Sequence, residues 1–294
     1  MQVQRERPND MTNWSETYRG AVPTWETDVT EHFTIAYYFD RIGDVERTLA
    51  ELLGLREFLR EPRLPRRFDV RFARELRAGA SFHIDSAAIA VDGGLRLGHR
   101  FVDSANGETV TWVEASWDMP PGALALERRE AIGTRLAAWE GPASEVRAEP
   151  QGEAGFTPTA RGRVKPGDIS VDGRFGLGAM VHRFTDASLQ TGAAIGMDAD
   201  YATTHRRGFS TFELGLRVTG SLAVDEPYLV ETGIASFGNS SLRMIHRLSD
   251  PRSGAEVARL SQYGVNLDLD ARRPARWPDE LRERAQRLML TMAA

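Results

Sequence analysis

One short stretch of the chain gathers residue types that can do acid–base chemistry. Asp28 is followed four residues later by His32, and Thr34 and two tyrosines come shortly after them. A positioned carboxylate or imidazole can take a proton from water or give one to a leaving group. The apolar spacing downstream of this stretch predicts a helix. We therefore expect Asp28 just before the helix start and His32 in its first turn.

The same residues also have a structural interpretation. Asp is a favoured N-cap, and Asp28 followed three residues later by Glu31 is similar to a capping box. The two interpretations are compatible, because an acid at a helix N-terminus is stabilised there in its ionised form. Taken by themselves, the residues favour a helix cap at Asp28 and a structural role for His32.

Other charged and titratable residues are weaker candidates. Arg66 and Arg67 precede the expected strand after the first helix, where solvated loop charge or a clamp on phosphate groups would explain them. His99 and His246 occupy matching positions within expected strands, which favours a role in the fold for both. Three further residues could face the helix start, although no spacing ties them to Asp28: Glu75, His83 and Asp85.

The chain repeats itself. Arg19-Gly-Ala-Val22 aligns with Arg161-Gly-Arg-Val164 at an offset of 142 residues (161 − 19). Leu95-Arg-Leu-Gly-His-Arg-Phe-Val-Asp103 aligns with Leu242-Arg-Met-Ile-His-Arg-Leu-Ser-Asp250 at an offset of 147 residues (242 − 95). Agreement at this many positions in one order indicates a duplicated unit.

Both halves show the same order of expected elements. The first unit is predicted to span residues 1–152 and the second residues 153–294. In each, a short strand leads into a long helix, and further strands and a closing helix follow. One helix and an antiparallel meander predict an α+β fold with the sheet wrapped on the helix. The expected strands are 18–26, 67–74, 81–91, 95–103 and 109–117, then 161–170, 211–219, 228–236, 241–248 and 256–268.

Composition limits the class of protein. The 294 residues, 41% of them hydrophobic, suffice for two ordinary cores. No run approaches the roughly 20 apolar residues of a membrane span, and the start lacks the apolar core of a signal peptide, so we expect a soluble cytoplasmic protein. A net charge of −5 argues against nucleic acid as a partner. Cysteine is absent, which excludes disulfides and thiolate–zinc sites, and no pattern implies a metal or redox cofactor.

The stretch from Asp28 to His32 resembles the hotdog thioesterases, in which an Asp-x-x-x-His-x-Asn pattern opens the central helix. This superfamily includes plant acyl-ACP thioesterases, bacterial acyl-CoA thioesterases and 4-hydroxybenzoyl-CoA thioesterase. The resemblance in fold covers nearly the whole chain, once per half, whereas the catalytic pattern covers only this stretch. It implies two tandem hotdog units that pair through their sheets as an intrachain pseudo-dimer, with the ligand between them.

The resemblance also implies roles for particular residues. Asp28 would be the base or nucleophile, His32 a positioning or polarising group, and amides near Phe33 and Thr34 the donors to the thioester oxygen. Thr30 and Thr34 depart from the family, because related enzymes often carry Asn at these places. The substrate-binding residues that follow from this comparison are Phe33, Trp25, Tyr37, Arg66 and Arg67.

The second half lacks the pattern. At the offset of 142, Asp28 falls on Ser170 and His32 falls on Arg174. We therefore expect the first unit to carry the chemistry and the second to supply the facing wall of the site.

Three functions remain open at this point. The favoured one is a hydrolase that cleaves an acyl-CoA thioester, with an acyl-ACP thioester as the second alternative. A dehydratase acting on a 3-hydroxyacyl thioester would share the fold but needs a His and an acid facing each other across the pocket. A protein that binds an acyl thioester or a partner without turnover is the third, because the second motif is degraded. Fusion already supplies the paired unit, so a monomer or a homodimer is expected.

Overall fold

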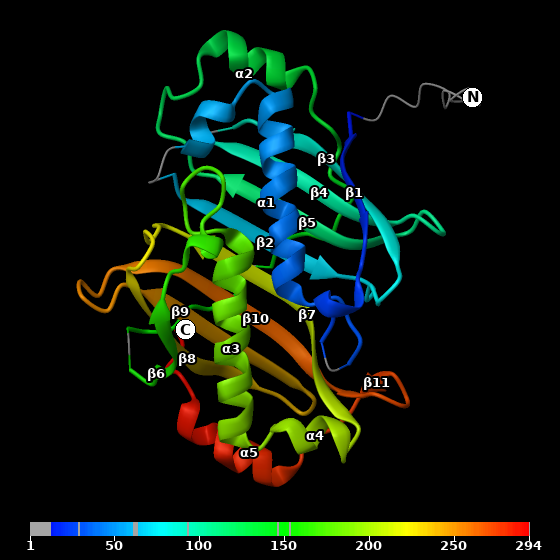
Figure 1. Ribbon diagram of the computed structural model, residues 1–294, viewed down its shortest axis with the longest axis vertical. Coiled ribbons are helices and arrows are strands. Elements are labelled where there is room, and N and C mark those ends of the chain that lie inside the picture. Colours follow the sequence, from blue (N-terminus) through cyan, green and yellow to red (C-terminus); the bar gives the residue numbers. More distant parts are fainter. Residues whose placement is uncertain are drawn as a thin grey trace.

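The chain forms two units of like topology joined in one sheet, with a long helix of each unit lying across the same face (Figure 1). The computed structural model describes residues 13–28, 30–60, 64–92, 94–145, 147–152 and 154–293. Residues 1–12 and Glu153, which begin the two predicted units, lie outside the described residues.

The first unit packs the helix α1 (Ile35–Leu52) on five strands. Residues at helical spacing, among them Phe39, Ile42, Val45 and Leu49, form the buried face of α1. The strands are β1 (Ser15–Ala21), β2 (Arg66–Phe72), β3 (Ser81–Ala90), β4 (Leu95–Asp103) and β5 (Thr109–Trp117), and the shorter elements are η1 (Thr24–Glu26), η2 (Arg56–Arg60) and α2 (Leu126–Gly133).

The second unit repeats this arrangement around the helix α3 (Leu177–Ile195). Its strands are β6 (Thr157–Arg163), β7 (Arg207–Val218), β8 (Pro227–Phe237), β9 (Ser241–Ser249), β10 (Glu256–Asp268) and the short β11 (Arg273–Pro274). The remaining elements are η3 (Pro166–Asp168), α4 (Ala199–Thr203), α5 (Asp279–Ala285) and η4 (Gln286–Leu288). Within the described residues, no helix is long and apolar enough to cross a membrane.

The sheet has the order β1-β3-β4-β5-β2-β7-β10-β9-β8-β6, with β11 beside β10. Read from either end, the order runs through corresponding strands of the two units. They join where β2 and β7 pair antiparallel, from Arg66↔Val218 to Arg71↔Glu213. This confirms the predicted α+β fold with two sheets in one continuous antiparallel surface.

Two predicted strands end earlier than expected. The strands expected at 18–26 and 161–170 stop at Ala21 and Arg163, because the next residues turn into η1 and η3. A proline stands at the entry to each turn, and proline cannot donate the amide hydrogen bond that would continue a sheet. The strands expected at 95–103, 109–117 and 256–268 have the observed bounds of β4, β5 and β10.

The two long helices meet at equivalent residues. Gly178 stands at the position of Ala36 (178 − 36 = 142), and a Cβ at Gly178 would lie 3.0 Å from the Ala36 carbonyl oxygen. A larger side chain there would separate α1 from α3. This contact places the start of α1 beside the second unit, where the candidate site lies.

Candidate active site

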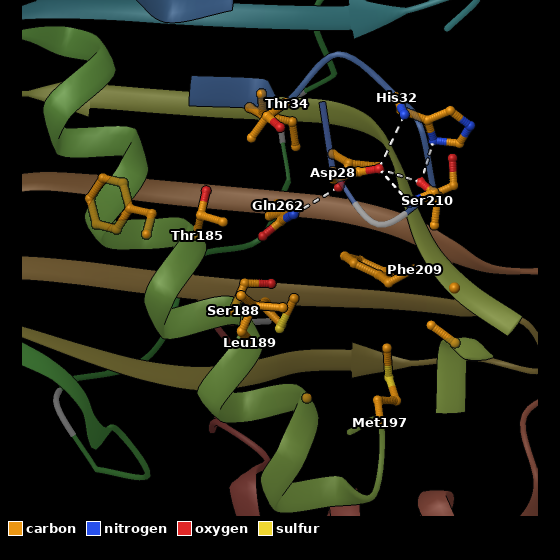
Figure 2. Close-up of a pocket in the computed structure, with 18 of the residues that line it drawn as sticks. Asp28, His32, Thr34, Thr185, Ser188, Leu189, Met197, Phe209, Ser210 and Gln262 are labelled. Carbon is orange, nitrogen blue, oxygen red and sulfur yellow. Dashed lines mark hydrogen bonds between the residues drawn. The ribbon is translucent and has the colours of Figure 1, made fainter. Parts of the chain in front are cut away.

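A cavity of about 730 Å³ lies in the second unit and opens beside the loop that precedes α1 (Figure 2). Its wall comes from the buried side of α3, from the strands β7, β9 and β10, and from the segment around α4. Figure 2 shows Thr185, Ser188 and Leu189 on α3, facing Phe209 across the space, with Asp28 and His32 at one end. The lining from the second unit is largely apolar. The first unit contributes the titratable and charged groups Asp28, His32, Arg74 and Glu75, together with the apolar or aromatic residues Phe33, Ile35, Tyr38, Phe72 and Leu76.

The loop before α1 is folded around the Asp28 carboxylate. Oδ1 of Asp28 accepts hydrogen bonds from the Thr30 amide at 2.8 Å, the Thr30 hydroxyl at 2.6 Å and the His32 amide at 3.1 Å. The Asp28 amide donates to the His32 carbonyl oxygen at 2.9 Å, which closes the loop. All three side-chain bonds use Oδ1, so Oδ2 can take a proton from water.

The second unit builds the same loop with different side chains. The Ser170 amide donates to the Arg174 carbonyl oxygen at 2.8 Å, as Asp28 does to His32. Glu31 has φ +65° and its counterpart Gly173 has φ +78°, so both loops use a left-handed residue at one place (173 − 31 = 142). The loop geometry therefore belongs to the repeat, and the side chains distinguish the two loops.

Two expectations about this loop are wrong. The N-cap of α1 is Thr34 and the helix begins at Ile35, so Asp28 is the centre of a separate turn and does not cap the helix. The Phe33 amide donates to the Leu76 carbonyl oxygen at 2.8 Å, and the Thr34 amide donates to the Glu26 carbonyl oxygen at 2.9 Å. Neither amide is available to an oxyanion, because both are already hydrogen-bonded to backbone carbonyl oxygens.

His32 connects the two units. Its Nδ1 lies 2.8 Å from the Thr30 hydroxyl, and its Nε2 lies 2.8 Å from Oε2 of Glu75. Arg272, in the turn between β10 and β11, pairs with Glu75 and places its nitrogens 3.2 and 3.3 Å from Nε2 of His32. The Ser210 hydroxyl, on β7, donates to Glu75 at 3.3 Å. Two residues of the second unit thus complete a site whose first residues lie in the first.

The charge on Glu75 is favoured by these neighbours. Burial alone would raise the pKa of Glu75, but the hydrogen bond and charge of His32, together with the charge of Arg272, hold that pKa below its usual value. An ionised Glu75 fixes the orientation of the His32 ring. Thr30 has one hydroxyl proton and gives it to Asp28, so Nδ1 of His32 must donate to the Thr30 oxygen.

No group of three His, Asp or Glu side chains in the described part of the chain is placed to hold a metal ion. The arrangement is instead a carboxylate and an imidazole at the mouth of an apolar cavity. Such a mouth can activate water next to a substrate whose apolar part fills the cavity.

The sequence and the fold were compared with known proteins. Residues 164–285 match the family model described as the thioesterase-like superfamily. The chain has the double hotdog fold, and its second unit is similar to the thioesterase-like superfamily. The matched segment is the unit that carries the cavity and lacks the acid–histidine pair. None of the curated proteins matches the sequence.

Solved structures share the double hotdog fold over most of the chain. A putative oleoyl thioesterase from Lactobacillus plantarum has a TM-score of 0.64 at 13% identity, covering 87% of this chain and 98% of its own. An acyl-ACP thioesterase from Bacteroides thetaiotaomicron gives 0.59 at 10% identity, covering 86% and 98%. The 12:0-ACP thioesterase from Umbellularia californica gives 0.55 at 14% identity, covering 84% and 92%. At these identities the likeness concerns the fold.

The equivalent space in the first unit is filled. Glu46, at the position of Ser188 (188 − 46 = 142), pairs with Arg66 at 3.0 Å and accepts a hydrogen bond from the Trp117 indole at 2.6 Å. All three side chains are nearly inaccessible to solvent. Trp117 corresponds to Gly264 (264 − 117 = 147), where the Phe209 ring and the Ser210 carbonyl oxygen lie in the direction that a side chain would take.

Several residues predicted to bind substrate lie away from the cavity. Arg66 belongs to the buried ion pair just described, and Arg67 pairs with Asp69 on the sheet, so neither lines it. Trp25 is 78% exposed outside it. Tyr37 packs edge-on against His182 of α3 at 5.1 Å between ring centres.

Four predicted residues do line the cavity together: Asp28, His32, Phe33 and Thr34.

Other residues of the site could not be assigned from the pattern around Asp28. Glu75 had no spacing that tied it to His32, and Arg272 is 240 residues from His32 in the chain. Gln262 carried a signal that alignment of the two halves could have revealed. It is polar where the first unit has Ala115 (262 − 115 = 147).

Proposed function

We propose that this protein hydrolyses an acyl thioester, with the acyl chain in the cavity of the second unit and the thioester at the Asp28 loop of the first. The observation that supports this most directly is that the Asp28 loop and the apolar cavity meet. Asp28, His32 and Glu75 line the same cavity as the apolar residues of α3 and β7. Water at this mouth would meet a carboxylate and a substrate carbonyl together.

In the proposed reaction, Asp28 takes a proton from water as the water oxygen bonds to the thioester carbonyl carbon. The carbonyl electrons move to the oxygen and return as the carbon–sulfur bond breaks. The thiolate leaves and recovers the proton, so the products are a carboxylic acid and a thiol. The first amides of α1, at Ile35 and Ala36, are candidates for the oxyanion donors, because the first turn of a helix has no intrahelical acceptors for them.

His32 has a positioning role in this proposal. Glu75 and Thr30 hold its two ring nitrogens, so the ring cannot turn away from the mouth. Its fixed charge distribution would polarise the thioester or the leaving sulfur. Thr30 couples the two groups, because it donates to Asp28 and accepts from His32.

The thiol part of the substrate belongs to the proposal as well. CoA and acyl carrier protein share the pantetheine arm, and the two ACP thioesterases named above have the same double fold. The arginines first considered for CoA phosphates, Arg66 and Arg67, are engaged in ion pairs. We therefore propose an acyl thioester of either carrier, to be separated by assaying one acyl group on both.

Replacement of Asp28 tests this function. Asp28→Asn keeps an oxygen that can accept the three loop hydrogen bonds, so the free energy of unfolding should change by less than about 1 kcal/mol. Loss of the base should lower turnover by about 100-fold or more. Release of free thiol from a panel of acyl-CoA and acyl-ACP substrates measures turnover.

The matched control is Ser170→Ala, in the equivalent loop of the second unit, which should leave turnover nearly unchanged. Turnover by Asp28→Asn equal to that of the parent protein would show that another group activates water. Failure of the parent to release thiol from any member of the panel would contradict hydrolysis altogether.

A further inference from the structure

Each unit contains a row of polar side chains linked by hydrogen bonds, which we call its polar chain and which runs from the edge strand toward the centre of the unit. In the first unit the Thr17 and Ser86 hydroxyls lie 2.7 Å apart, and Ser86 lies 2.7 Å from Nδ1 of His99. In the second unit, Thr159 and Thr232 lie 2.9 Å apart, and Thr232 lies 2.8 Å from Nδ1 of His246. The histidines are fully buried in both. The first links of the chains are therefore a property of the repeat.

The two chains end differently. Nε2 of His246 lies 3.3 Å from Oε1 of Gln262, and Nε2 of Gln262 donates to the Thr211 hydroxyl at 2.7 Å. Nε2 of His99 is buried without a hydrogen-bond partner among the described residues. The difference follows from one position, since the counterpart of Gln262 is Ala115. Only the second unit extends its chain to the cavity, which both Gln262 and Thr211 line.

The direction of the protons follows from the contacts. Burial lowers the pKa of His246 to about 4, so the ring carries one proton near neutral pH. Oε1 of Gln262 is only an acceptor, so that proton must lie on Nε2, and Nδ1 accepts from Thr232. The Gln262 amide nitrogen is therefore the group turned to Thr211. Its second proton and the hydroxyl proton of Thr211 are left as donors at the cavity wall.

The fold does not require this extension. The first unit buries His99 beside Ala115 with the same strand pairing, Ser86↔His99 and His99↔Val113, that the second has around His246. A polar side chain at the wall of an apolar cavity is costly unless its groups are hydrogen-bonded. Oriented donors in such a place are typical of a site that recognises an acceptor oxygen.

The donors lie near the thioester end of the cavity. Thr211 follows Ser210 directly, and the Ser210 hydroxyl donates to Glu75 at the mouth. One residue of a strand advances about 3.3 Å. An acyl chain that enters at Asp28 therefore passes Gln262 and Thr211 within its first few carbons.

We propose that Gln262 and Thr211 bind an oxygen on the acyl chain close to the thioester carbonyl, so that the substrate is a β-hydroxyacyl or β-oxoacyl thioester. Both groups present an acceptor oxygen to the same two donors. Two experiments test this inference. The kinetic one rests on the proposed hydrolysis, and the second measures binding alone.

The kinetic arm compares dodecanoyl, β-hydroxydodecanoyl and β-oxododecanoyl thioesters of pantetheine. The parent protein should have a kcat/KM about tenfold or more higher for at least one oxygenated substrate than for dodecanoyl. Gln262→Met keeps the side-chain volume and removes the donor, so it should abolish this preference. If Gln262→Met does not fold, Gln262→Ala is used in its place, because the first unit has Ala115 at this position.

The matched control is Ser86→Ala, which removes a link of the polar chain in the filled unit. It should keep the full preference for the oxygenated thioester. The ratio of the two rates for each variant separates recognition from a general loss of activity. A parent protein that prefers dodecanoyl, or a Gln262→Met variant that lowers all rates alike, would overturn the inference.

The binding arm uses the free acids β-hydroxydodecanoate and dodecanoate in titration calorimetry. The parent protein should bind the hydroxy acid about tenfold more tightly, and Gln262→Met should bind the two alike. A protein that shows this difference but hydrolyses no thioester refutes the proposed function and leaves the oxygen site standing. Equal affinity of the parent for both acids, or no binding of either, overturns the oxygen site even where hydrolysis is observed.

Discussion

The two units have the same backbone fold, but the interior of one is filled by side chains and that of the other contains a cavity. The first has the acid–histidine loop and a core filled by side chains, whereas the second has the same loop without these groups and a cavity under its helix. The difference between the interiors can be followed at equivalent positions. Phe39 corresponds to Val181 on the helices (181 − 39 = 142), and Phe68 corresponds to Leu214, because they pair with the equivalent residues Ala115 and Gln262.

The loop side chains show the same division. Arg174 stands where the first unit has His32 and is almost inaccessible. Burial raises the pKa of Glu46, and the charges of Arg66 and Arg174 oppose that rise. The place where a second active site would have formed is thus filled by charged residues and an indole. Duplication provided two loops and two interiors, and the proposed function uses one of each, so the proposed site needs both units.

The largest expected effect concerns the filled interior. Glu46→Gln removes the carboxylate and leaves the buried Arg66 without its ion-pair partner, which should reduce the free energy of unfolding by about 3 kcal/mol. Urea unfolding followed by circular dichroism measures the change. Ser188→Ala, at the equivalent position, should change it by less than about 0.5 kcal/mol. Equal losses in the two variants would show that the interiors do not differ in this way.

The next effect concerns the hollow interior. Val181→Phe combined with Leu214→Phe copies the aromatic residues of the first unit into the cavity wall. We expect kcat/KM for a dodecanoyl thioester to fall by about 100-fold, because the chain loses its space, while a butyryl thioester loses far less. Stability should be retained, since the cavity accepts the added volume that would overpack a filled core. An equal loss for both chain lengths would place the acyl group elsewhere.

A smaller effect is expected for the residue that joins the units at the mouth. Arg272→Ala should lower turnover about tenfold, because Glu75 and His32 lose the charge that orders them. Arg206→Ala, which removes a neighbouring exposed arginine paired with Asp270 at 3.0 Å, is the control and should keep turnover. Similar rates for both variants would mean that the first unit orders His32 unaided.

Arg272→Ala should also change the pH dependence of the free energy of unfolding. The pKa of Glu75 in the folded protein lies below its unfolded value of 4.5, so its stabilising contribution is present above pH 4.5 and is lost as the pH falls through the lowered pKa. Without Arg272 that pKa rises, and the loss should occur at higher pH. Unfolding by urea between about pH 3 and 6 follows this shift.

Local patterns determined much of the fold and part of the site. The matched blocks at offsets 142 and 147 predicted the repeat, and alternating residues gave the bounds of β4, β5 and β10. Backbone pairing and side-chain alternation depend on neighbours along the chain, which is why these elements could be predicted. The spacing of Asp28 and His32, and their absence from the second unit, were also visible in the sequence. The start of α1 was missed, because the pattern of an N-cap does not reveal that the preceding loop is itself paired.

Only the tertiary structure decided which unit is hollow and which residues complete the mouth. Whether a space remains under a helix depends on the summed volumes of side chains from several strands, as with Phe68 and Leu214, and no spacing along the chain encodes that sum. Glu75, Ser210 and Arg272 meet His32 because the β2–β7 pairing brings the second unit against the loop. Charge and hydrogen bonding act over a few ångströms in space, so residues 240 positions apart in the chain can share one site.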